Sequence, residues 1–348
     1  MRALTVIPEK SGSLEIRDIP DAVASPNELL VEGIAFGVCA TDREIASGHF
    51  GAAPPGEDRL VLGHESLGRV LTAPAGSDFA AGDLVVGIVR RPDPVPCGAC
   101  ARGEFDMCRN NLYAERGIKH LHGYASEQWT VETDYAVKLD PALGDTGVLM
   151  EPATVVAKVW EQIDRVSTRA WYEPRRVLVT GAGPIGQLAA LLGTQRDLDV
   201  HVLALADKGI QPDMARKLGA TYHSDPLPEV ADRIHPDVII EATGVPSIAM
   251  AAMTHPAPAG IVCLTGISPT GRQLDIDAGE LNRRTVLENN LIFGSVNANK
   301  RHYHQAAQAL AAADPNWRSG LITRRLPLAK AIDAFTSGQD DIKIMVEL

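Results

Sequence analysis

The sequence predicts an α/β protein of two domains, one rich in β-strands and one built on a doubly wound parallel sheet. Three observations support this prediction. The chain has 348 residues, which is long for a single hydrophobic core. Residues 1–154 consist of short apolar stretches separated by glycine and proline. Residues 155–298 instead alternate short apolar runs with helical segments, a pattern typical of a parallel sheet.

The first domain is expected to comprise residues 1–154 and 299–348, because the last segment contains strand-like pieces that return to it. Its amino terminus, MRALTVIPEK, indicates a first strand and lacks the features of a signal peptide. Such a domain suits a partly open barrel or sandwich. Its expected strands and helix include Leu29–Gly33, Leu67–Leu71, Leu84–Val89, the helix His304–Ala312, Leu321–Arg324 and Lys343–Glu347.

The second domain is expected over residues 155–298 and opens with helical spacing of apolar residues at Val155–Ile163. Short apolar runs then recur at similar intervals. The expected strands are Arg176–Thr180, His201–Leu205, Val238–Glu241, Ile261–Leu264 and Leu291–Phe293.

A glycine-rich turn joins the first of these strands to a helix. Gly181, Gly183 and Gly186 form the pattern G-x-G-x-x-G, with Pro184 and Ile185 between them. The glycines allow a tight turn, close approach of the backbone to a pyrophosphate, and close packing of helix on strand. The free N–H groups of the helix then face the phosphates. Because the motif lies between a strand and a helix, it predicts a dinucleotide site.

The residues after the second strand bear on the choice of cofactor. An acidic side chain at this place binds the ribose 2′-hydroxyl of NAD, whereas arginine accommodates the 2′-phosphate of NADP. The chain has Asp207 and Lys208 here. Asp207 favours NAD, although Lys208 could tolerate NADP, and both could be solvated loop charges.

Four side chains of metal-ligating types are spread over the first domain. They are Cys39, His64, Glu65 and Glu151, and together they offer the thiolate, imidazole and carboxylate ligands of a catalytic zinc. Taken singly, each has an ordinary interpretation as a buried thiol, a turn histidine or a surface charge. Their spacing does not by itself show that they converge.

A second cluster consists of Cys97, Cys100 and Cys108, which predicts a structural zinc site. Such a site needs four ligands, and Asp93 or Asp106 could supply the fourth. A redox pair or an unoccupied site are the alternatives. The chain has five cysteines, and an odd number in a chain of this length argues against a disulfide framework.

Composition excludes several classes of function. The formal net charge of −11 disfavours nucleic-acid binding, which needs clustered lysine and arginine. Apolar runs fall short of the ~18 residues that span a bilayer. We therefore expect a cytoplasmic protein with neither a membrane nor a nucleic acid as partner.

The combined motifs resemble the zinc-containing medium-chain alcohol dehydrogenase family over essentially the whole chain. The segment Gly63–Gly68 reads G-H-E-x-x-G, which is similar to that family's signature, and Cys39 with Thr41 resembles its first zinc ligand and proton-relay hydroxyl. The resemblance implies a GroES-like catalytic domain, a Rossmann cofactor domain and a homodimer or homotetramer formed through the sheet edge at Leu291–Val296. It also implies that Thr243 belongs to the cofactor site.

Several further segments resemble the glucose dehydrogenase branch of the family. In that branch the equivalent of Glu115 contacts sugar hydroxyls, that of Asn297 lies near nicotinamide and substrate, and that of Glu151 is near or on the zinc. The segments that carry this resemblance are Val89–Pro92, Glu115–Ile118, His122–Tyr124 with Ser126 and Glu127, Glu151–Pro152 and Gly294–Asn299.

The chain departs from the pattern at three places, one of which is Leu205–Asp207, where the branch often carries a basic element. Pro94 stands where the structural-zinc lobe has its first cysteine, and Val155 stands where some glucose dehydrogenases have a sugar-binding aspartate. The predicted reaction is transfer of hydride from C1 of an aldose to NAD(P), giving the lactone. A polyol or other secondary-alcohol dehydrogenase, and a non-catalytic NAD(P)-binding redox sensor that uses Cys97 and Cys100, are the alternative functions.

Overall fold

The computed structural model describes residues 1–271, 273–336, 338 and 340–348. By their contacts these residues divide into two compact units. Unit 1 comprises Met1–Thr154 with Asn297–Leu348, and unit 2 comprises Val155–Val296. The sequence placed the second boundary between residues 298 and 299, two residues later, so that Asn297 belongs to unit 1 in the structure.

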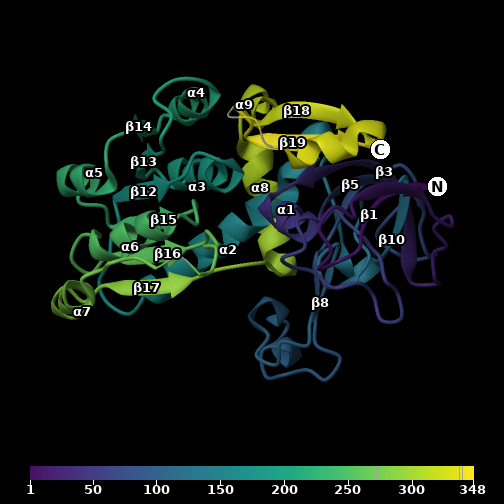
Figure 1. Ribbon diagram of the computed structural model, residues 1–348, viewed down its shortest axis with the longest axis horizontal. Helices are drawn as coiled ribbons and strands as arrows, with labels where there is room; N and C mark the ends of the chain where they lie inside the picture. Colours follow the sequence, from purple (N-terminus) through teal and green to yellow (C-terminus); the bar gives the residue numbers. More distant parts are fainter. Residues whose placement is uncertain (272, 337, 339) are drawn as a thin grey trace. The chain divides into compact units, whose positions relative to one another are not determined.

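Unit 1 is the β-rich part (Figure 1). Its described residues form a seven-stranded sheet in the order β11-β6-β5-β3-β19-β18, with β10 also paired to β3, and two small sheets, β2-β1-β4 and β7-β8-β9. The strands are β1 (Arg2–Val6), β2 (Glu15–Asp18), β3 (Glu28–Val38), β4 (Leu60–Val61), β5 (Glu65–Thr72), β6 (Leu84–Gly87), β7 (Arg90–Arg91), β8 (Ala114–Arg116), β9 (His120–Leu121), β10 (Gln128–Glu132), β11 (Ala136–Lys138), β18 (Ile322–Pro327) and β19 (Lys343–Glu347).

Short helices connect these strands and cover the sheet. The helices are α1 (Ala40–Ala46), η1 (Cys100–Arg102), η2 (Phe105–Met107), η3 (Thr133–Tyr135), η4 (Pro141–Leu149), α8 (Lys300–Ala312), α9 (Pro315–Leu321) and η5 (Leu328–Phe335). Helix α2 (Met150–Ser167) begins in unit 1 and continues into unit 2.

The hydrophobic core of unit 1 fixes the ends of its long strand. In β3 buried residues alternate with less buried ones at first and then form a continuous buried run up to Val38. Phe36 and Val38 pack in one cluster with Ile45 of α1 and Ile344 of β19. This core therefore holds together the end of β3, the end of α1 and the beginning of β19.

Unit 2 contains a parallel sheet flanked by helices. Within residues 155–271 and 273–296, six parallel strands occur in the order β14-β13-β12-β15-β16-β17, which is the strand order of the doubly wound dinucleotide-binding fold. The strands are β12 (Arg176–Thr180), β13 (Asp199–Leu203), β14 (Thr221–His223), β15 (Val238–Glu241), β16 (Ile261–Leu264) and β17 (Leu291–Gly294). The helices are α3 (Pro184–Thr194), α4 (Ile210–Lys217), α5 (Leu227–Ile234), α6 (Pro246–Thr254) and α7 (Ala278–Leu287).

The predicted fold class is confirmed, and two details of unit 2 need correction. The second strand was predicted to reach Leu205, but β13 ends at Leu203 and the side chain of Leu205 is 97% exposed. The strand β14 was missed, because Thr221–His223 is short and only half-buried and so lacks an apolar run. Throughout the described residues, every helix is too short or too polar to span a bilayer.

Candidate metal and substrate site

The structure brings Cys39, His64 and Glu65 together. Cys39 Sγ lies 3.0 Å from His64 Nε2, and one ligand atom from each of the three side chains falls within 4.8 Å of the others. His64 and Glu65 are buried, and Cys39 is half-buried. A thiolate, an imidazole and a carboxylate at such distances fit the ligand chemistry of zinc.

Asp42, which the sequence reasoning missed, positions both Cys39 and His64. Its Oδ2 accepts the backbone N–H of Cys39 at 2.9 Å, and its Oδ1 lies 3.3 Å from His64 Nδ1. Asp42 is fully buried in the first turn of α1. A carboxylate behind the outer nitrogen of a histidine leaves the other nitrogen free to bind a metal. An acidic residue three positions after Cys39 was the available signal.

Electrostatics couple these groups. Burial lowers the pKa of His64, but the charges of Asp42 and Cys39 outweigh burial and raise that pKa well above its usual value. For Asp42 the signs are opposite. Burial raises its pKa, but the charge of His64 outweighs burial and the pKa is lowered. The cluster thus carries negative charge that attracts a cation, whether a proton or a metal ion.

Glu65 has a buried partner that the sequence did not reveal. Lys343 of β19 donates to Oε1 and Oε2 of Glu65 at 2.6 and 2.5 Å. The two residues are 278 positions apart in the sequence, so only the tertiary structure could show the pair.

Glu151 and Thr41 lie in the same unit as the cluster. Glu151 is half-buried in the first turn of α2, and it is not one of the three side chains that meet within 4.8 Å. Burial raises the pKa of Glu151 to about 7, while the charge of His64 lowers that pKa and the charge of Glu65 raises it. Glu151 is therefore close enough to interact electrostatically with the cluster. Thr41 is half-buried in α1, two residues after Cys39.

A polar constellation forms around Glu115. Its Oε1 accepts hydrogen bonds from Arg90 Nε at 3.0 Å, from Arg90 Nη2 at 2.9 Å and from Asn297 Nδ2 at 2.7 Å. Glu115 is 6% exposed and Asn297 8% exposed. Among the described residues no donor contacts Oε2, so this oxygen can accept a hydrogen bond from a substrate hydroxyl. Asn297 has a φ of 61°, a left-handed conformation that asparagine tolerates better than most residues.

The cysteine lobe brings its three thiols together without the predicted acidic ligand. Cys97, Cys100 and Cys108 have their sulfur atoms within 4.8 Å of one another, and Cys97 and Cys100 are 3.6 Å apart. Asp93 is outside this group, because its carboxylate accepts Val95 N–H at 2.8 Å and Asn110 Nδ2 at 2.7 Å.

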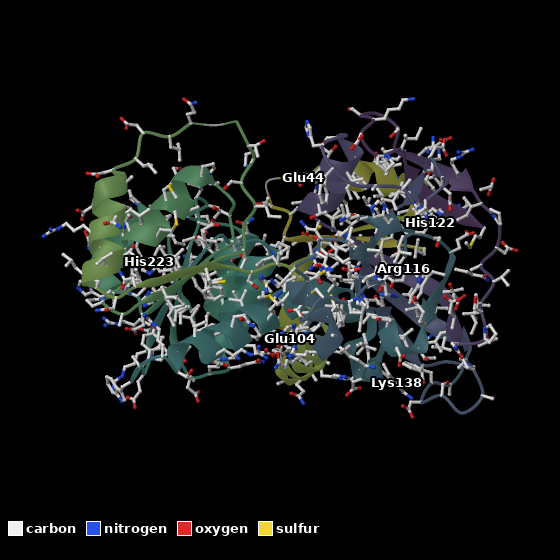
Figure 2. All side chains as sticks on the ribbon, turned by 90° about the horizontal axis from the view of Figure 1, so that it is seen from below. Glu44, Glu104, Arg116, His122, Lys138 and His223 are labelled. Carbon is white, nitrogen blue, oxygen red and sulfur yellow. The ribbon has the colours of Figure 1, made fainter. Side chains whose placement is uncertain are left out.

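Asp106, the other acid considered for the lobe, is also engaged elsewhere. Its Oδ1 accepts Asn299 Nδ2 at 2.6 Å. Arg301 Nη2 and Glu104 Oε1 are 3.8 Å apart, and Glu104 is labelled in Figure 2. These contacts attach the lobe to the start of α8, but they leave three thiols as the metal ligands that the described residues gather there.

The glycine turn of unit 2 has the geometry of a phosphate site. Gly181 has a φ of 95°, and a Cβ on Gly186 would lie 1.8 Å from the carbonyl oxygen of Gly181, so the turn requires glycine at both positions. A Cβ on Gly183 would meet no atom of the described residues within 4 Å. Gly183 caps α3, whose first residue is Pro184, and Ile185 follows. The open space at a helix amino terminus fits a pyrophosphate.

Thr243 lies beside this turn and is held by a buried acid. A Cβ on Gly181 would be 3.1 Å from Thr243 Cγ2. Glu241 at the end of β15 accepts the backbone N–H of Thr243 at 2.7 Å and also its hydroxyl. Asp207 and Lys208 are exposed after β13. Burial raises the pKa of Tyr222 on β14, and the charge of Asp207 adds to this increase.

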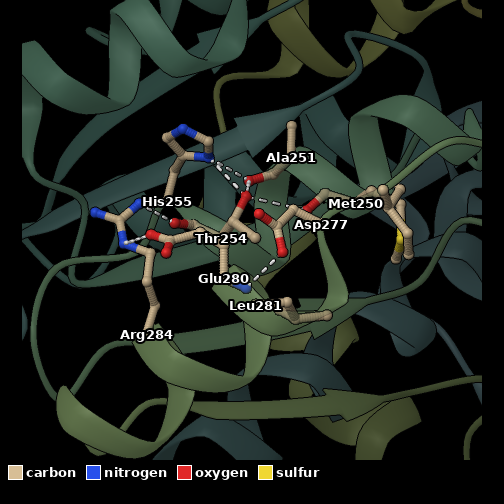
Figure 3. A pocket seen from close by; sticks show the side chains of 9 residues that line it. Met250, Ala251, Thr254, His255, Asp277, Glu280, Leu281 and Arg284 are labelled. Carbon is tan, nitrogen blue, oxygen red and sulfur yellow. Dashed lines mark hydrogen bonds and ion pairs between the residues drawn. The ribbon is translucent and has the colours of Figure 1, made fainter.

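A pocket between α6 and α7 contains none of the predicted site residues. Figure 3 shows its polar side chains turned toward one another. Asp277 caps α7 by accepting Glu280 N–H at 2.9 Å, and His255 Nδ1 is 2.8 Å from Ala251 O. Arg284 donates to Thr254 O. Because these groups satisfy one another, we do not place the chemistry there.

Comparison with known proteins agrees with this geometry. The alcohol dehydrogenase GroES-like domain family matches residues 25–141, and the glucose dehydrogenase C-terminus family matches residues 144–348. A glucose 1-dehydrogenase of Methanocella arvoryzae is 37% identical over 360 residues, covering 100% of this chain and 99% of the relative. One from Thermoproteus tenax is 36% identical over 358 residues, with coverage of 100% and 99%.

A solved structure is equally similar in fold. Glucose dehydrogenase of Haloferax mediterranei in complex with NADP, Zn and gluconolactone superposes with a TM-score of 0.92 at 31% identity, covering 100% of this chain and 99% of that one. The family match spans more than half of the chain, and the relatives match along its whole length. The chain therefore belongs to the glucose dehydrogenase branch of the zinc-containing medium-chain alcohol dehydrogenase family.

Proposed function

We propose that the protein is a zinc-dependent aldose 1-dehydrogenase, which transfers hydride from C1 of an aldose such as glucose to NAD(P) and releases a proton and the lactone. The observation that carries this proposal is the meeting of Cys39 Sγ and His64 Nε2 at 3.0 Å, with Asp42 behind the histidine. The names of the relatives, glucose 1-dehydrogenases, support the substrate class.

Cys39 and His64 would hold the zinc, with the carboxylates of Glu65 and Glu151 nearby. A zinc ion bound there supplies Lewis acidity, which lowers the pKa of a hydroxyl by several units. Asp42 keeps the His64 ring oriented with Nε2 toward the thiolate. Thr41 offers a hydroxyl for passing the released proton toward solvent, and Glu151, with a pKa of about 7, can take up or give off a proton near neutral pH.

Glu115 and Asn297 would bind the hydroxyls of the sugar. A sugar has many hydroxyls and little apolar surface, and an unmatched buried polar group costs about 1–3 kcal/mol. The Oε2 atom of Glu115 provides a fixed acceptor, since Arg90 and Asn297 hold the same carboxylate through Oε1. The salt bridge between Glu115 and Arg90 thus coexists with an oxygen that accepts no hydrogen bond from the described residues.

The glycine turn, Thr243 and the loop after β13 would bind the dinucleotide. Gly181, Gly183 and Gly186 admit the pyrophosphate, and a nicotinamide cofactor bound there accepts the hydride. We favour NAD, because Asp207 follows β13 and its carboxylate would repel a 2′-phosphate. The Haloferax mediterranei structure contains NADP, so a preference for NAD would distinguish this chain from that relative.

We also propose that the protein forms a homodimer or homotetramer. The support is that β17 lies at the edge of its sheet in the described part of unit 2, where its backbone groups can pair with a second copy.

The test is a substrate panel. Reduction of NAD and of NADP is measured with aldoses, polyols and simple secondary alcohols, with and without a chelator, and the product is identified. We expect chelator-sensitive oxidation of aldoses to lactones, with higher kcat/KM for NAD. Turnover of polyols alone would replace the aldose assignment. Cofactor binding without turnover of any substrate would point to a redox sensor.

A further inference from the structure

The buried pair of Glu65 and Lys343 is unusual in lying directly against the proposed metal ligands. Their side chains are 2% and 1% exposed. Each charge depends on the other, because removal of one partner leaves an uncompensated charge in the interior. Fold stability alone does not explain why a charged pair occupies this position, because apolar side chains of similar volume can fill such a site equally well.

The backbone is built to let these two side chains meet. Strand β3 lies between β5, which carries Glu65, and β19, which carries Lys343. Gly37 of β3 is paired with Glu65 on one side and with Met345 on the other. A Cβ at Gly37 would lie 1.9 Å from Glu65 Oε2. Glycine at this position therefore leaves the space through which the Glu65 carboxylate crosses β3 and reaches Lys343.

The same carboxylate is within reach of the metal position. One of its oxygens lies within 4.8 Å of the ligand atoms of Cys39 and His64. Carboxylate oxygens also serve as zinc ligands in proteins, at about 2.0–2.2 Å. Both oxygens of Glu65, however, accept hydrogen bonds from Lys343 Nζ. The ammonium group thus competes with a metal ion for this carboxylate.

We infer that Lys343 is a positioning residue, which holds the Glu65 carboxylate beside the metal ion and off its coordination sphere, so that one position stays open to an exchangeable ligand. This inference rests on the proposed zinc-dependent function. It revises the role predicted for Glu65 from metal ligand to anionic neighbour. Without the ammonium group, the buried carboxylate takes the metal ion as its partner, because that is the nearest positive charge.

Replacement of zinc by cobalt(II) tests the role of Lys343 directly. The visible absorption of cobalt(II) weakens as its coordination number rises from four to five or six. The spectrum of the Lys343→Met variant is recorded as a difference from that of His64→Ala, which removes any contribution of the lobe cysteines. We expect Lys343→Met to show a weaker band and slower removal of cobalt by a chelator, by about tenfold, the lower end of the 10–100-fold effect of residues that orient ligands.

Matched variants separate positioning from structure. Lys343→Arg keeps the charge and should keep the wild-type spectrum, and Glu65→Ala combined with Lys343→Met should restore the strong band. Lys158→Met is the control for loss of a buried lysine, since Lys158 is 2% exposed and donates to Val296 O at 3.0 Å in unit 2. Its spectrum should not change.

Two results would overturn the inference alone. One is a Lys343→Met enzyme with the wild-type cobalt band and the wild-type rate of cobalt loss. The other is a changed cobalt band in Glu65→Gln, a variant that retains Lys343 and can be used if Lys343→Met does not fold. We expect Glu65→Gln to keep the strong band, and a change would show that Glu65 is a metal ligand. A wild-type enzyme whose cobalt spectrum does not depend on His64 would instead overturn the zinc assignment itself, and this inference with it.

Discussion

The Cys39 cluster and the cysteine lobe are both groups of metal-ligating side chains in unit 1, and they are supported in different ways. The cluster consists of Cys39 between β3 and α1, His64 just before β5 and Glu65 in β5, with buried partners in Asp42 and Lys343. The three lobe thiols lie within one short segment and are held by local contacts, such as Arg109 N–H to Cys97 Sγ at 3.4 Å.

This difference indicates what each site does. A site assembled from distant strands, whose ligands are fixed by buried charged partners, has the rigidity that positioning chemistry demands. A site made by one segment can change or be lost without moving the rest of the fold. We therefore assign the chemistry to the Cys39 cluster and only a local role to the lobe, and the following variants test that division.

The largest effect is expected for His64→Ala. Loss of a ligand removes the metal and with it several kcal/mol of charge stabilisation, and at about 1.4 kcal/mol per factor of ten kcat should fall by about 1,000-fold or more. Bound zinc is counted by elemental analysis alongside kcat. His122→Ala is the matched control, because His122 pairs with exposed Glu57 at 3.0 Å and should retain both activity and zinc.

Glu115→Gln should have the next largest effect. The amide keeps the volume of the side chain but removes its charge, which pairs with buried Arg90 and is the charged acceptor of the proposed sugar site. We expect kcat/KM for the aldose to fall by about 10–100-fold, equivalent to the 1–3 kcal/mol of one buried hydrogen bond. The KM for the dinucleotide should stay unchanged in the same steady-state series. Equal loss with aldoses and with a simple alcohol would remove Glu115 from the sugar site.

Cys100→Ser should have a small effect on activity. The side chain is 9% exposed, so replacement of the thiol by a hydroxyl should lower the free energy of unfolding by about 1 kcal/mol, as for a typical point mutation. Chemical denaturation measures this loss, and kcat should stay within about twofold of the wild type, since no reacting group is touched. A collapse of kcat in a folded variant would show that the lobe takes part in the chemistry.

The thiols themselves should differ in pH dependence. Backbone N–H donors, that of Arg109 foremost, lower the pKa of Cys97 to about 6, whereas burial raises the pKa of Cys263 to about 12. The thiolate exists above the pKa, so alkylation of Cys97 in metal-free protein should reach half of its maximal rate near pH 6, and Cys263 should not react in folded protein. Peptide mapping after brief iodoacetamide treatment distinguishes the two; equal labelling would contradict the lobe geometry.

Local patterns predicted the fold well because they depend on neighbouring residues. The strand Arg176–Thr180 and the glycine turn after it were readable from a β-branched run followed by fixed spacing, and both occur in the structure as predicted. The strand β14 could not be read, since Thr221–His223 carries only three residues and no apolar pattern.

The candidate site was only partly readable, for a related reason. The types of ligand at Cys39 and His64 were evident, but their meeting depends on how β3 and β5 align. Lys343 gave no signal at all, because its partner is 278 residues away. Asp93 was considered as a ligand because of its closeness in sequence to the cysteines, and in the structure its carboxylate accepts hydrogen bonds from Val95 and Asn110.

Titration of metal-free enzyme with zinc tests the assigned metal site most directly. Aldose-dependent reduction of the dinucleotide is followed as zinc is added to the chelator-treated protein and to its Cys39→Ala variant. We expect no turnover without metal. In the wild type the rate should rise with added zinc and saturate at about one equivalent of zinc per chain, and in the variant it should not rise. Oxidation of aldoses at full rate by metal-free protein, or by Cys39→Ala, would contradict the account.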